Sequence, residues 1–373
     1  MDHGCCVACR WRLARTGWVA GLVEYRAASD DELEACIALQ HLAFRPRQDG
    51  APDRYRSYVR EDPTYRPGQT RVALVDGQIV GHLRVWDRKL SVRGQVVTAG
   101  GIGSLLTHPD HRGQGIASGL LANTEAYLEE VGYDIGLLFT IIGTSYYTAR
   151  GWTPIPIAVF EIDLNDAKDV DPVECRPLKL AEDLDAVRRV HANCSMVYTG
   201  TEQRDEAYWS TGPARYRSVF PNVGIERDGE VCGYVNWDVT ESGIWVVECC
   251  AEEASDYGRL ARIVFGAAGE SSERMLRGSL PRDHPFVPAL ESLVGGPAVW
   301  AKHDEMMVKV SRWDLLKEKL CSDSVVLPES FPTDPGEIRS SWRALLGCSE
   351  AGNSWLDRFG ECPPTFYWWT DIF

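Results

Sequence analysis

The chain has 373 residues, of which 44% are hydrophobic and 25% charged, as in a folded protein of two or three domains. The net charge of −15 excludes nucleic acid as the main partner, because phosphate binding needs a basic surface; it suits a cationic ligand or serves solubility alone. No apolar run is long enough to cross a membrane, so no membrane partner is expected.

The first 20 residues are expected to form a disordered extension, because they lack the continuous apolar core of a signal peptide. Cys6 and Cys9 have the spacing of a metal-binding pair, with His3 and Cys5 close by. No second ligand pair follows at a zinc spacing, and we expect no metal. The 12 cysteines are scattered along the chain, which is typical of reduced thiols and predicts a cytoplasmic protein.

Folded sequence is expected to begin with a short strand over residues 23–26. A helix should follow Ser29, which forms a capping box with Glu32. Alternating side chains on both sides of Asp76-Gly77 predict a β-hairpin. The next elements expected are a strand over 96–107, a helix over 116–131 and a buried strand over 134–140.

The second half of the sequence echoes the first. The stretch DGEVCGYVNWD, from Asp228 to Asp238, matches DGQIVGHLRVWD, from Asp76 to Asp87, with one residue fewer. Such self-similarity predicts a duplicated domain. The expected division is a first domain over 21–165, a second over 166–312, and an extension over 313–373 that packs back onto the second domain.

The stretch HPDHRGQGIASGLL, which starts at His108, places an arginine and two glycines where a helix must begin. The first backbone N–H groups of a helix have no partners within it and can bind an anion. Gly113 and Gly115 would let a pyrophosphate approach the backbone, Arg112 adds a positive charge, and Ser118 adds a hydroxyl. A tight turn into the helix would also explain the glycines. The spacing fits neither a P-loop nor the dinucleotide fingerprint, so NAD is not expected.

The hexapeptide RGQGIA at the same place resembles the R/Q-x-x-G-x-G/A motif of the GNAT family of N-acyltransferases. Tyr147, with Gly151 and Trp152 behind it, is similar to that family's Y-x-x-x-G-[FYW] element. The resemblance covers about residues 22–160 and implies an acyl-CoA co-substrate, with Tyr147 as the general acid that protonates the leaving thiolate. A core aromatic role is the other interpretation of Tyr147. The cofactor-binding residues implied are Leu105, Leu106, Thr107, Arg112, Gly113, Gln114, Gly115, Ile116, Ala117 and Ser118.

The resemblance also implies the fold: α/β, with two tandem GNAT-type domains, each a mixed, mostly antiparallel central sheet flanked by helices. In the second copy, Glu252 and Glu253 stand where amides and an arginine should meet phosphate, and carboxylates would repel it. We therefore expect a degenerate second domain and one cofactor per chain. The second domain would complete the acceptor site or a dimer interface, so a homo-oligomer is left open.

Tandem GNAT domains with a C-terminal extension resemble the enhanced-intracellular-survival aminoglycoside acetyltransferases. In that group the base is the carboxylate of a C-terminal phenylalanine, and this chain ends in Phe373. The third, sterol-carrier-like domain of that group is nearly absent here, and the size fits glycopeptide-antibiotic N-acyltransferases better. The resemblance implies direct acyl transfer to a primary amine of a small, cationic amino sugar. A protein or peptide amine, a non-catalytic acyl-CoA sensor and a scaffold remain alternatives.

Residue types alone do not identify the base that takes the proton of the amine. His82, His191 and Asp87 are candidates, and each is also typical of a structural or surface residue. His284 lies in a turn sequence and is expected to act there.

Overall fold

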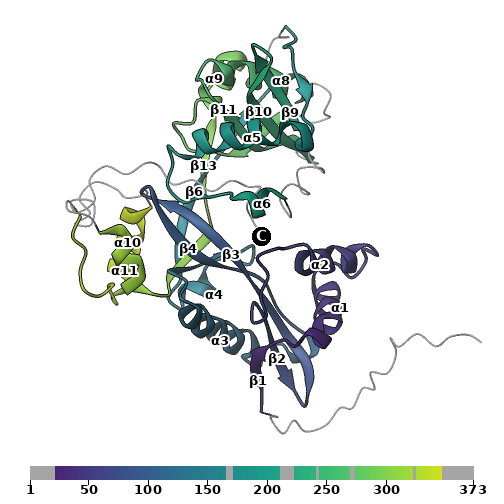
Figure 1. The fold of residues 1–373 in the computed structure, drawn as a ribbon, viewed down its shortest axis with the longest axis vertical. Helices are drawn as coiled ribbons and strands as arrows, with labels where there is room; N and C mark the ends of the chain where they lie inside the picture. The colour runs from purple at the N-terminus through teal and green to yellow at the C-terminus, as the bar shows by residue number, and fades with distance from the viewer. Residues whose placement is uncertain are drawn as a thin grey trace, which may run out of the picture.

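The structure is a computed structural model, and it describes residues 22–164, 171–210, 222–240, 243–268, 274–321 and 325–346. The extension expected over residues 1–20, with its cysteine pair, lies outside the described residues, as does Phe373. The described chain has a mixed α/β fold built around one long, mostly antiparallel sheet (Figure 1). No helix within these ranges is long and apolar enough to span a membrane.

The first unit is a sheet whose strands follow one another in chain order. Neighbouring strands are antiparallel, except for the last pair, which is parallel. The strands are β1 (Glu24–Ala27), β2 (Thr70–Val75), β3 (Gln78–Val92), β4 (Gln95–Thr107) and β5 (Ile135–Phe139). The helices are η1 (Asp30–Glu32), α1 (Leu33–Phe44), α2 (Ala51–Arg60), η2 (Pro109–His111), α3 (Ile116–Val131) and α4 (Ser145–Thr148).

The two faces of this sheet carry different helices. Leu83 and Val85 of β3 pack with Leu120 of α3, so α3 covers the face to which these side chains point. Side chains alternate along a strand, so Arg84 and Trp86 point to the opposite face. There the ring of Trp86 lies 6.0 Å from that of Tyr58 on α2.

The second unit repeats this arrangement, which confirms the predicted duplication. Its central strands are β9 (Asn222–Arg227), β10 (Glu230–Thr240), β11 (Gly243–Ala251) and β12 (Met275–Ser279), and β11 and β12 again form a parallel pair. Its helices are α5 (Leu180–Ser195), α6 (Glu206–Ser210), α8 (Asp256–Ala268) and α9 (Phe286–Val294), and its short strand is β7 (Arg176–Pro177). The short strand β8 (Thr201–Glu202) pairs with β3 of the first unit.

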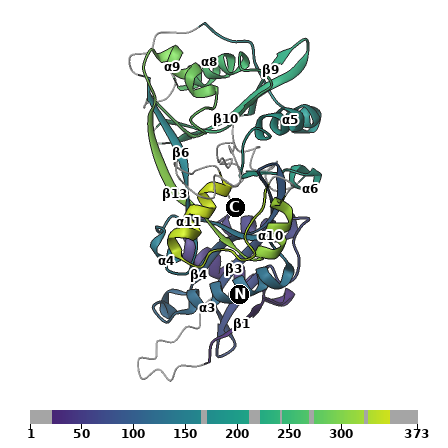
Figure 2. The same ribbon diagram turned by 90° about the vertical axis from the view of Figure 1, so that its left-hand side faces the viewer.

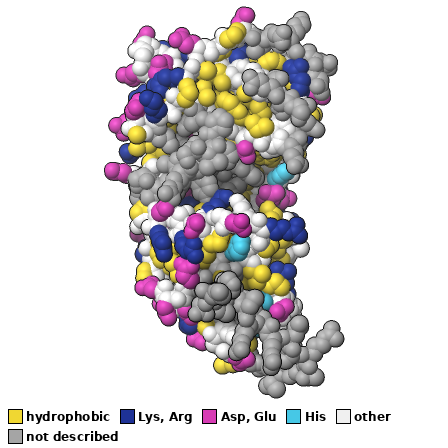
Figure 3. Space-filling model, turned by 90° about the vertical axis from the view of Figure 1, so that its right-hand side faces the viewer, with side chains coloured by type: hydrophobic (Ala, Val, Ile, Leu, Met, Phe, Trp, Pro, Cys, Tyr) yellow, Lys and Arg dark blue, Asp and Glu magenta, His cyan; other side chains and the backbone are white. Residues whose placement is uncertain are grey.

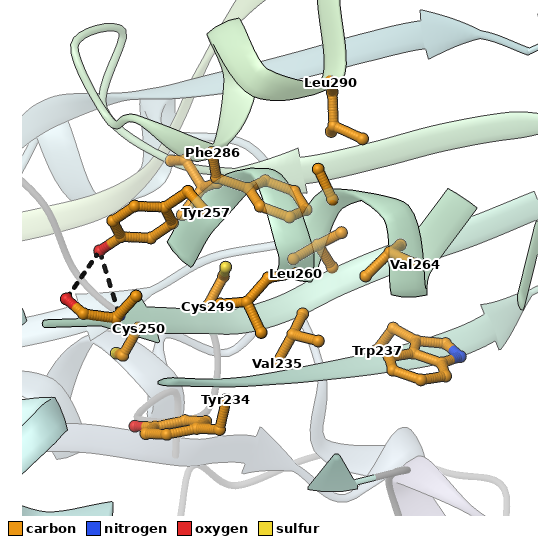
Figure 4. Packing of buried hydrophobic residues seen from close by; sticks show 14 of the residues in the cluster. Tyr234, Val235, Trp237, Cys249, Cys250, Tyr257, Leu260, Val264, Phe286 and Leu290 are labelled. Carbon is orange, nitrogen blue, oxygen red and sulfur yellow. Dashed lines mark hydrogen bonds between the residues drawn. The ribbon is translucent and has the colours of Figure 1, made fainter. Parts of the chain in front are cut away.

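The hairpin turns show how closely the copies agree. Asp76 and Gly77 have φ angles of 51° and 75°, and Asp228 and Gly229 have 53° and 82°. Positive φ at both central residues is the conformation that favours Asp-Gly in a tight hairpin. Each hairpin has a register shift soon after the turn, next to Gly81 in one copy and Gly233 in the other. The core of the second unit forms between β10, β11 and α8, where the Tyr257 hydroxyl contacts the backbone of Ala251 (Figure 4).

Two long strands join the units into one sheet. β6 (Thr153–Asp163) leaves the first unit and pairs with β12 of the second. β13 (Val299–Val310) returns from the second unit and lies between β5 and β6. β6 therefore joins the sheet of the second unit and β13 joins that of the first, so the two units expected on either side of residue 165 share one sheet.

The expectation that the C-terminal extension packs on the second domain is wrong for the part that the structure describes. The end of β13 pairs with the start of β5, Val310 opposite Ile135, so the chain emerges on the first unit. There α10 (Trp313–Leu320) and α11 (Pro335–Leu345) bury Leu316 and Trp342 in a cluster with strands of the first unit (Figure 2). Lys319 of α10 also pairs with the buried Asp134, with 2.5 Å between Nζ and Oδ2.

Candidate active site

The start of α3 is open and shaped by two glycines. Gly113 and Gly115 have φ angles of 76° and 79°, in the left-handed region that disfavours other residues. No atom lies within 4 Å of the place where a Cβ would stand on either glycine. The glycines are therefore required by the backbone and leave free space in front of the first amides of a 16-residue helix.

Two arginines flank this helix start. Arg112 comes directly before Gly113, and its Nε lies 3.4 Å from the carbonyl oxygen of Thr107. Arg150 reaches over from the end of α4 and donates to Ser118 Oγ at 2.6 Å. The guanidinium of Arg150 also lies over the ring of Tyr146, 3.9 Å from its centre. Sequence reasoning missed Arg150; its place inside the Y-x-x-x-G element, next to the required glycine, was the available signal.

Between β4 and β5 the sheet opens. The paired residues run from Ala99 with Ile135 to Ile102 with Leu138, and among the described residues no ladder pairing joins 103–107 to β5. Ser104 has a φ of 54°, and the register of β3 against β4 shifts at the same level. This bulge turns the end of β4 away from β5 and frees backbone groups to bind an extended amide chain. The predicted residues Leu105, Leu106 and Thr107 all lie on this splayed segment.

Tyr147 lies in the short helix α4, on the side of the sheet that carries α3. Its ring is 7% exposed and packs edge-on against Trp152, and Tyr146 lies beside it. The carbonyl of Tyr147 accepts from the amides of Arg150 and Trp152, a turn that places Gly151 at a φ of 84°. Burial raises the pKa of Tyr147 to about 12, so the phenol keeps its proton at neutral pH.

His82 lies beside the opening between β4 and β5, which we call the slot. It is 2% exposed on β3, directly across from Leu106, and its Nδ1 lies 3.2 Å from the carbonyl oxygen of Ser104. A carbonyl can only accept, so Nδ1 carries the proton and Nε2 has the lone pair. Burial lowers the pKa of His82 to about 4, which makes it a neutral acceptor and a weak base.

The other candidate bases lie elsewhere. His191 is on α5, which belongs to the second unit, whereas α3 and α4 belong to the first (Figure 1); its ring is edge-on to Trp209. Asp87 accepts from Arg66 at 2.8 Å and Gln69 at 2.9 Å, and from the hydroxyl of Tyr133. His284 accepts from the amide of Phe286 at the start of α9. The structure thus places His82 and Tyr147 in the first unit and His191 in the second.

At the matching place in the second unit, acids fill the helix start. Asp256 is the first residue of α8, is 3% exposed and pairs with Arg227. Glu252 pairs with Arg189 at 2.9 Å, and Glu253 also pairs with Arg227. These carboxylates already satisfy the positive end of the helix, so an anion would meet repulsion there.

On the face drawn in Figure 3, Lys and Arg side chains lie among Asp and Glu side chains rather than in one basic area. Within the described ranges, no group of three or more His, Cys, Asp and Glu side chains is arranged to hold a metal ion.

A sequence model of the family described as acetyltransferase (GNAT) domain matches residues 24–155. A search of curated protein sequences finds no match to this chain. Among solved structures, a probable N-acyltransferase from Enterococcus faecalis is similar, with a TM-score of 0.65 and 17% identity, over 80% of this chain and 75% of that one. Eis1 from Mycobacterium abscessus has a TM-score of 0.54 and 17% identity, over 80% and 75%.

An N-myristoyltransferase from Saccharomyces cerevisiae, solved with bound myristoyl-CoA, has a TM-score of 0.52 and 12% identity. This match covers 79% of this chain and 80% of that one. At such identities these structures establish the fold, and the family match covers the unit that holds the open helix start and Tyr147. Residues 24–155 therefore match the acetyltransferase (GNAT) domain family, and the chain that contains them has the fold of the GNAT acyltransferases.

Proposed function

We propose that this protein transfers an acyl group from acyl-CoA directly to a primary amine, on an amino sugar of an antibiotic of the aminoglycoside or glycopeptide type. The observation that carries the proposal is the open helix start of α3, which lies at the end of a splayed strand and within reach of the α4 turn. The pyrophosphate would bind the amides from Gly113 to Ser118, with Arg112 and Arg150 beside them. The second unit would bind no cofactor.

The chemistry requires a proton donor and a proton acceptor. The amine nitrogen attacks the thioester carbon, a C–N bond forms and the C–S bond breaks. Tyr147 gives its proton to the leaving thiolate, for which a phenol that stays protonated at neutral pH is suited. The amine loses a proton in the same reaction; His82 is too weak a base to take it alone, so we assign it the role of orienting a water or the amine. Phe373 remains a proposal for the base, whereas His191 lies in the second unit, away from this site.

The sequence resemblances support an amino sugar as the acceptor, and we place it on the face of β4 away from α3. Gly101 and Gly103 lie across from Trp86 and Arg84 and contribute no side chains to that face. A longer acyl donor is also supported, since an N-myristoyltransferase with bound myristoyl-CoA shares the fold. Acyl-CoA is made in the cytoplasm, which supports a cytoplasmic location.

The test is a thiol-release assay of a panel of amino sugars and peptide amines, with acetyl-CoA and myristoyl-CoA as donors. We expect Tyr147→Phe to lower kcat about 100-fold while the Kd for CoA stays within about twofold, because only the proton transfer is removed. The matched control is Tyr127→Phe, at a buried tyrosine of the same core whose ring lies under Arg71. Unchanged turnover in Tyr147→Phe would remove the assigned acid. Binding of CoA without thiol release from any pair would favour the sensor instead.

A further inference from the structure

The face of the first unit's sheet opposite to α3 holds a buried arginine, Arg84, some of whose N–H donors have no partner. The side chain of Arg84 is 3% exposed. Its Nη2 donates to Asp62 Oδ2 at 2.7 Å, while its Nε and Nη1 are buried and have no hydrogen-bond partner. A guanidinium carries five N–H donors, and buried donors are normally satisfied. Arg84 therefore has donors to spare for a further acceptor atom.

The neighbours of Arg84 do not supply that atom. The other oxygen of Asp62 accepts from the amide of Thr64 at 2.9 Å and from its hydroxyl at 2.6 Å. The rings of Tyr65 and Trp86 lie against the guanidinium, 4.6 and 4.5 Å from its carbon to the ring centres. These contacts hold the group in place without using its free N–H donors, and we call these four side chains, Arg84, Asp62, Tyr65 and Trp86, the Arg84 site.

The position of the Arg84 site relates it to the slot. Arg84 lies directly across from Gly103, the first residue of β4 beyond its pairing with β5. Facing residues of an antiparallel pair share one side of the sheet, and this side is opposite to α3. An amine that attacks from this side, while the pyrophosphate lies at α3, would bring the rest of the acceptor next to Arg84.

We propose that Arg84 binds a carboxylate of the acceptor, so that the preferred acceptor carries a carboxylate as well as its amine. The inference rests on the proposed acyl transfer and narrows its substrate class from a purely cationic amino sugar to one with an acidic group. A carboxylate is the group that matches guanidinium donors best, and burial makes the pair stronger than it would be in water. Burial also lowers the pKa of Arg84 to about 10, as expected for a cation with too few partners.

The test compares two amino sugars that differ only at the carboxylate: muramic acid, which is glucosamine with a lactyl group, and the amide of that lactyl group. We expect the wild type to prefer the acid over the amide by about 10- to 100-fold in kcat/KM. Arg84→Met should abolish the preference, and Arg84→Lys should keep part of it. The control is Arg66→Met, since Arg66 pairs with Asp87 on the other side of the sheet. Melting temperature and CoA affinity report whether the variants are folded.

Equilibrium binding of the two sugars to the enzyme with CoA separates this inference from the proposed function. Tighter binding of the acid, lost in Arg84→Met, would support the carboxylate site even if no sugar were turned over. Turnover or binding that is equal for acid and amide would overturn it and leave the transferase intact. Binding of neither sugar in a folded, CoA-bound protein would also overturn it. A preference that persists in Arg84→Met would place the carboxylate elsewhere.

Discussion

His82 is a buried neutral imidazole, and its protonation links stability to pH. Burial lowers its pKa to about 4 in the folded chain, against about 6.5 in an unfolded one. Below pH 6.5 His82 is protonated in the unfolded chain, whereas in the folded chain it takes up this proton only near pH 4. The stabilisation is therefore complete above pH 6.5 and is lost as the pH falls toward 4. We expect His82 to lower the free energy of unfolding by about 2 kcal/mol between pH 7 and pH 5.

This expectation is measured by urea unfolding at the two pH values. His82→Asn should remove the loss assigned to His82, because asparagine can still donate to the carbonyl of Ser104 and does not titrate. His303, which is exposed on β13, provides the control His303→Asn, and its pH dependence should match the wild type. An equal loss in His82→Asn and the wild type would mean that His82 takes up its proton without cost.

Single residues differ in how far the sequence reveals them. The role of Gly113 and Gly115 in the RGQGIA motif was predictable, because two glycines at a helix start indicate a backbone with positive φ angles, which both residues have. Arg84 and Arg150 were not, because an isolated arginine in a sequence is most often exposed, and only the folded sheet shows what surrounds it. Ser118 was expected to lie at the phosphate, and in the structure its hydroxyl accepts from Arg150.

At the scale of elements, β13 braces the turn that carries Tyr147. Lys309 Nζ donates to the carbonyl of Arg150 at 2.9 Å and to Glu125 at 2.8 Å. Glu125 of α3 also accepts from the indole N–H of Trp152 at 2.8 Å. A strand that comes from the second unit thus ties α3 to the α4 turn, the two elements between which CoA is proposed to lie.

We expect Lys309→Met to lower kcat several-fold and the free energy of unfolding by about 1–3 kcal/mol, because it leaves Glu125 and the carbonyl of Arg150 without a partner. The Kd for CoA should change by less than twofold, since the amides at the start of α3 are untouched. Lys302→Met, at an exposed position of the same strand, is the control for both measurements. A loss of stability with unchanged kcat would show that the brace has no part in placing Tyr147.

The elements themselves followed from periodicity and turn residues. The hairpins at Asp76-Gly77 and Asp228-Gly229, the strand over 96–107 and the helix over 116–131 all match the structure. The contact of Lys309 with Arg150 was not predictable, because they are far apart in sequence and meet only through sheet pairing. The position of α10 was predicted wrongly for the same reason, because it depends on the pairing of β13 with β5. The sequence of a single apolar strand does not show which strand it pairs with.

For the whole molecule, the strands that cross between units make the first unit incomplete on its own. The described sheet runs without a break from β1 through β5, β13, β6 and β12 to β7. One apolar cluster contains Leu90, Val97 and Ile135 of the first unit together with Met306 of β13 and Leu316 of α10. A boundary drawn in the sequence after residue 165 would therefore cut through a core rather than between two cores.

We expect a fragment of residues 22–164 to fail to fold, whereas residues 22–346 should fold and bind CoA. Each large apolar side chain contributes about 1.5–3 kcal/mol when buried, and a whole domain is stable by only about 5–15 kcal/mol. Without β13, α10 and α11, the fragment exposes Leu90, Val97 and Ile135 and leaves β5 as an unpaired edge, which favours aggregation.

Circular dichroism melting, the fraction of protein in the soluble lysate and calorimetric titration with CoA compare the two fragments. Residues 22–346 should give one cooperative transition, because the junction strands belong to both units. A monomeric 22–164 fragment that melted cooperatively and bound CoA as tightly as the longer one would show that the proposed CoA site at the start of α3 folds without the second unit.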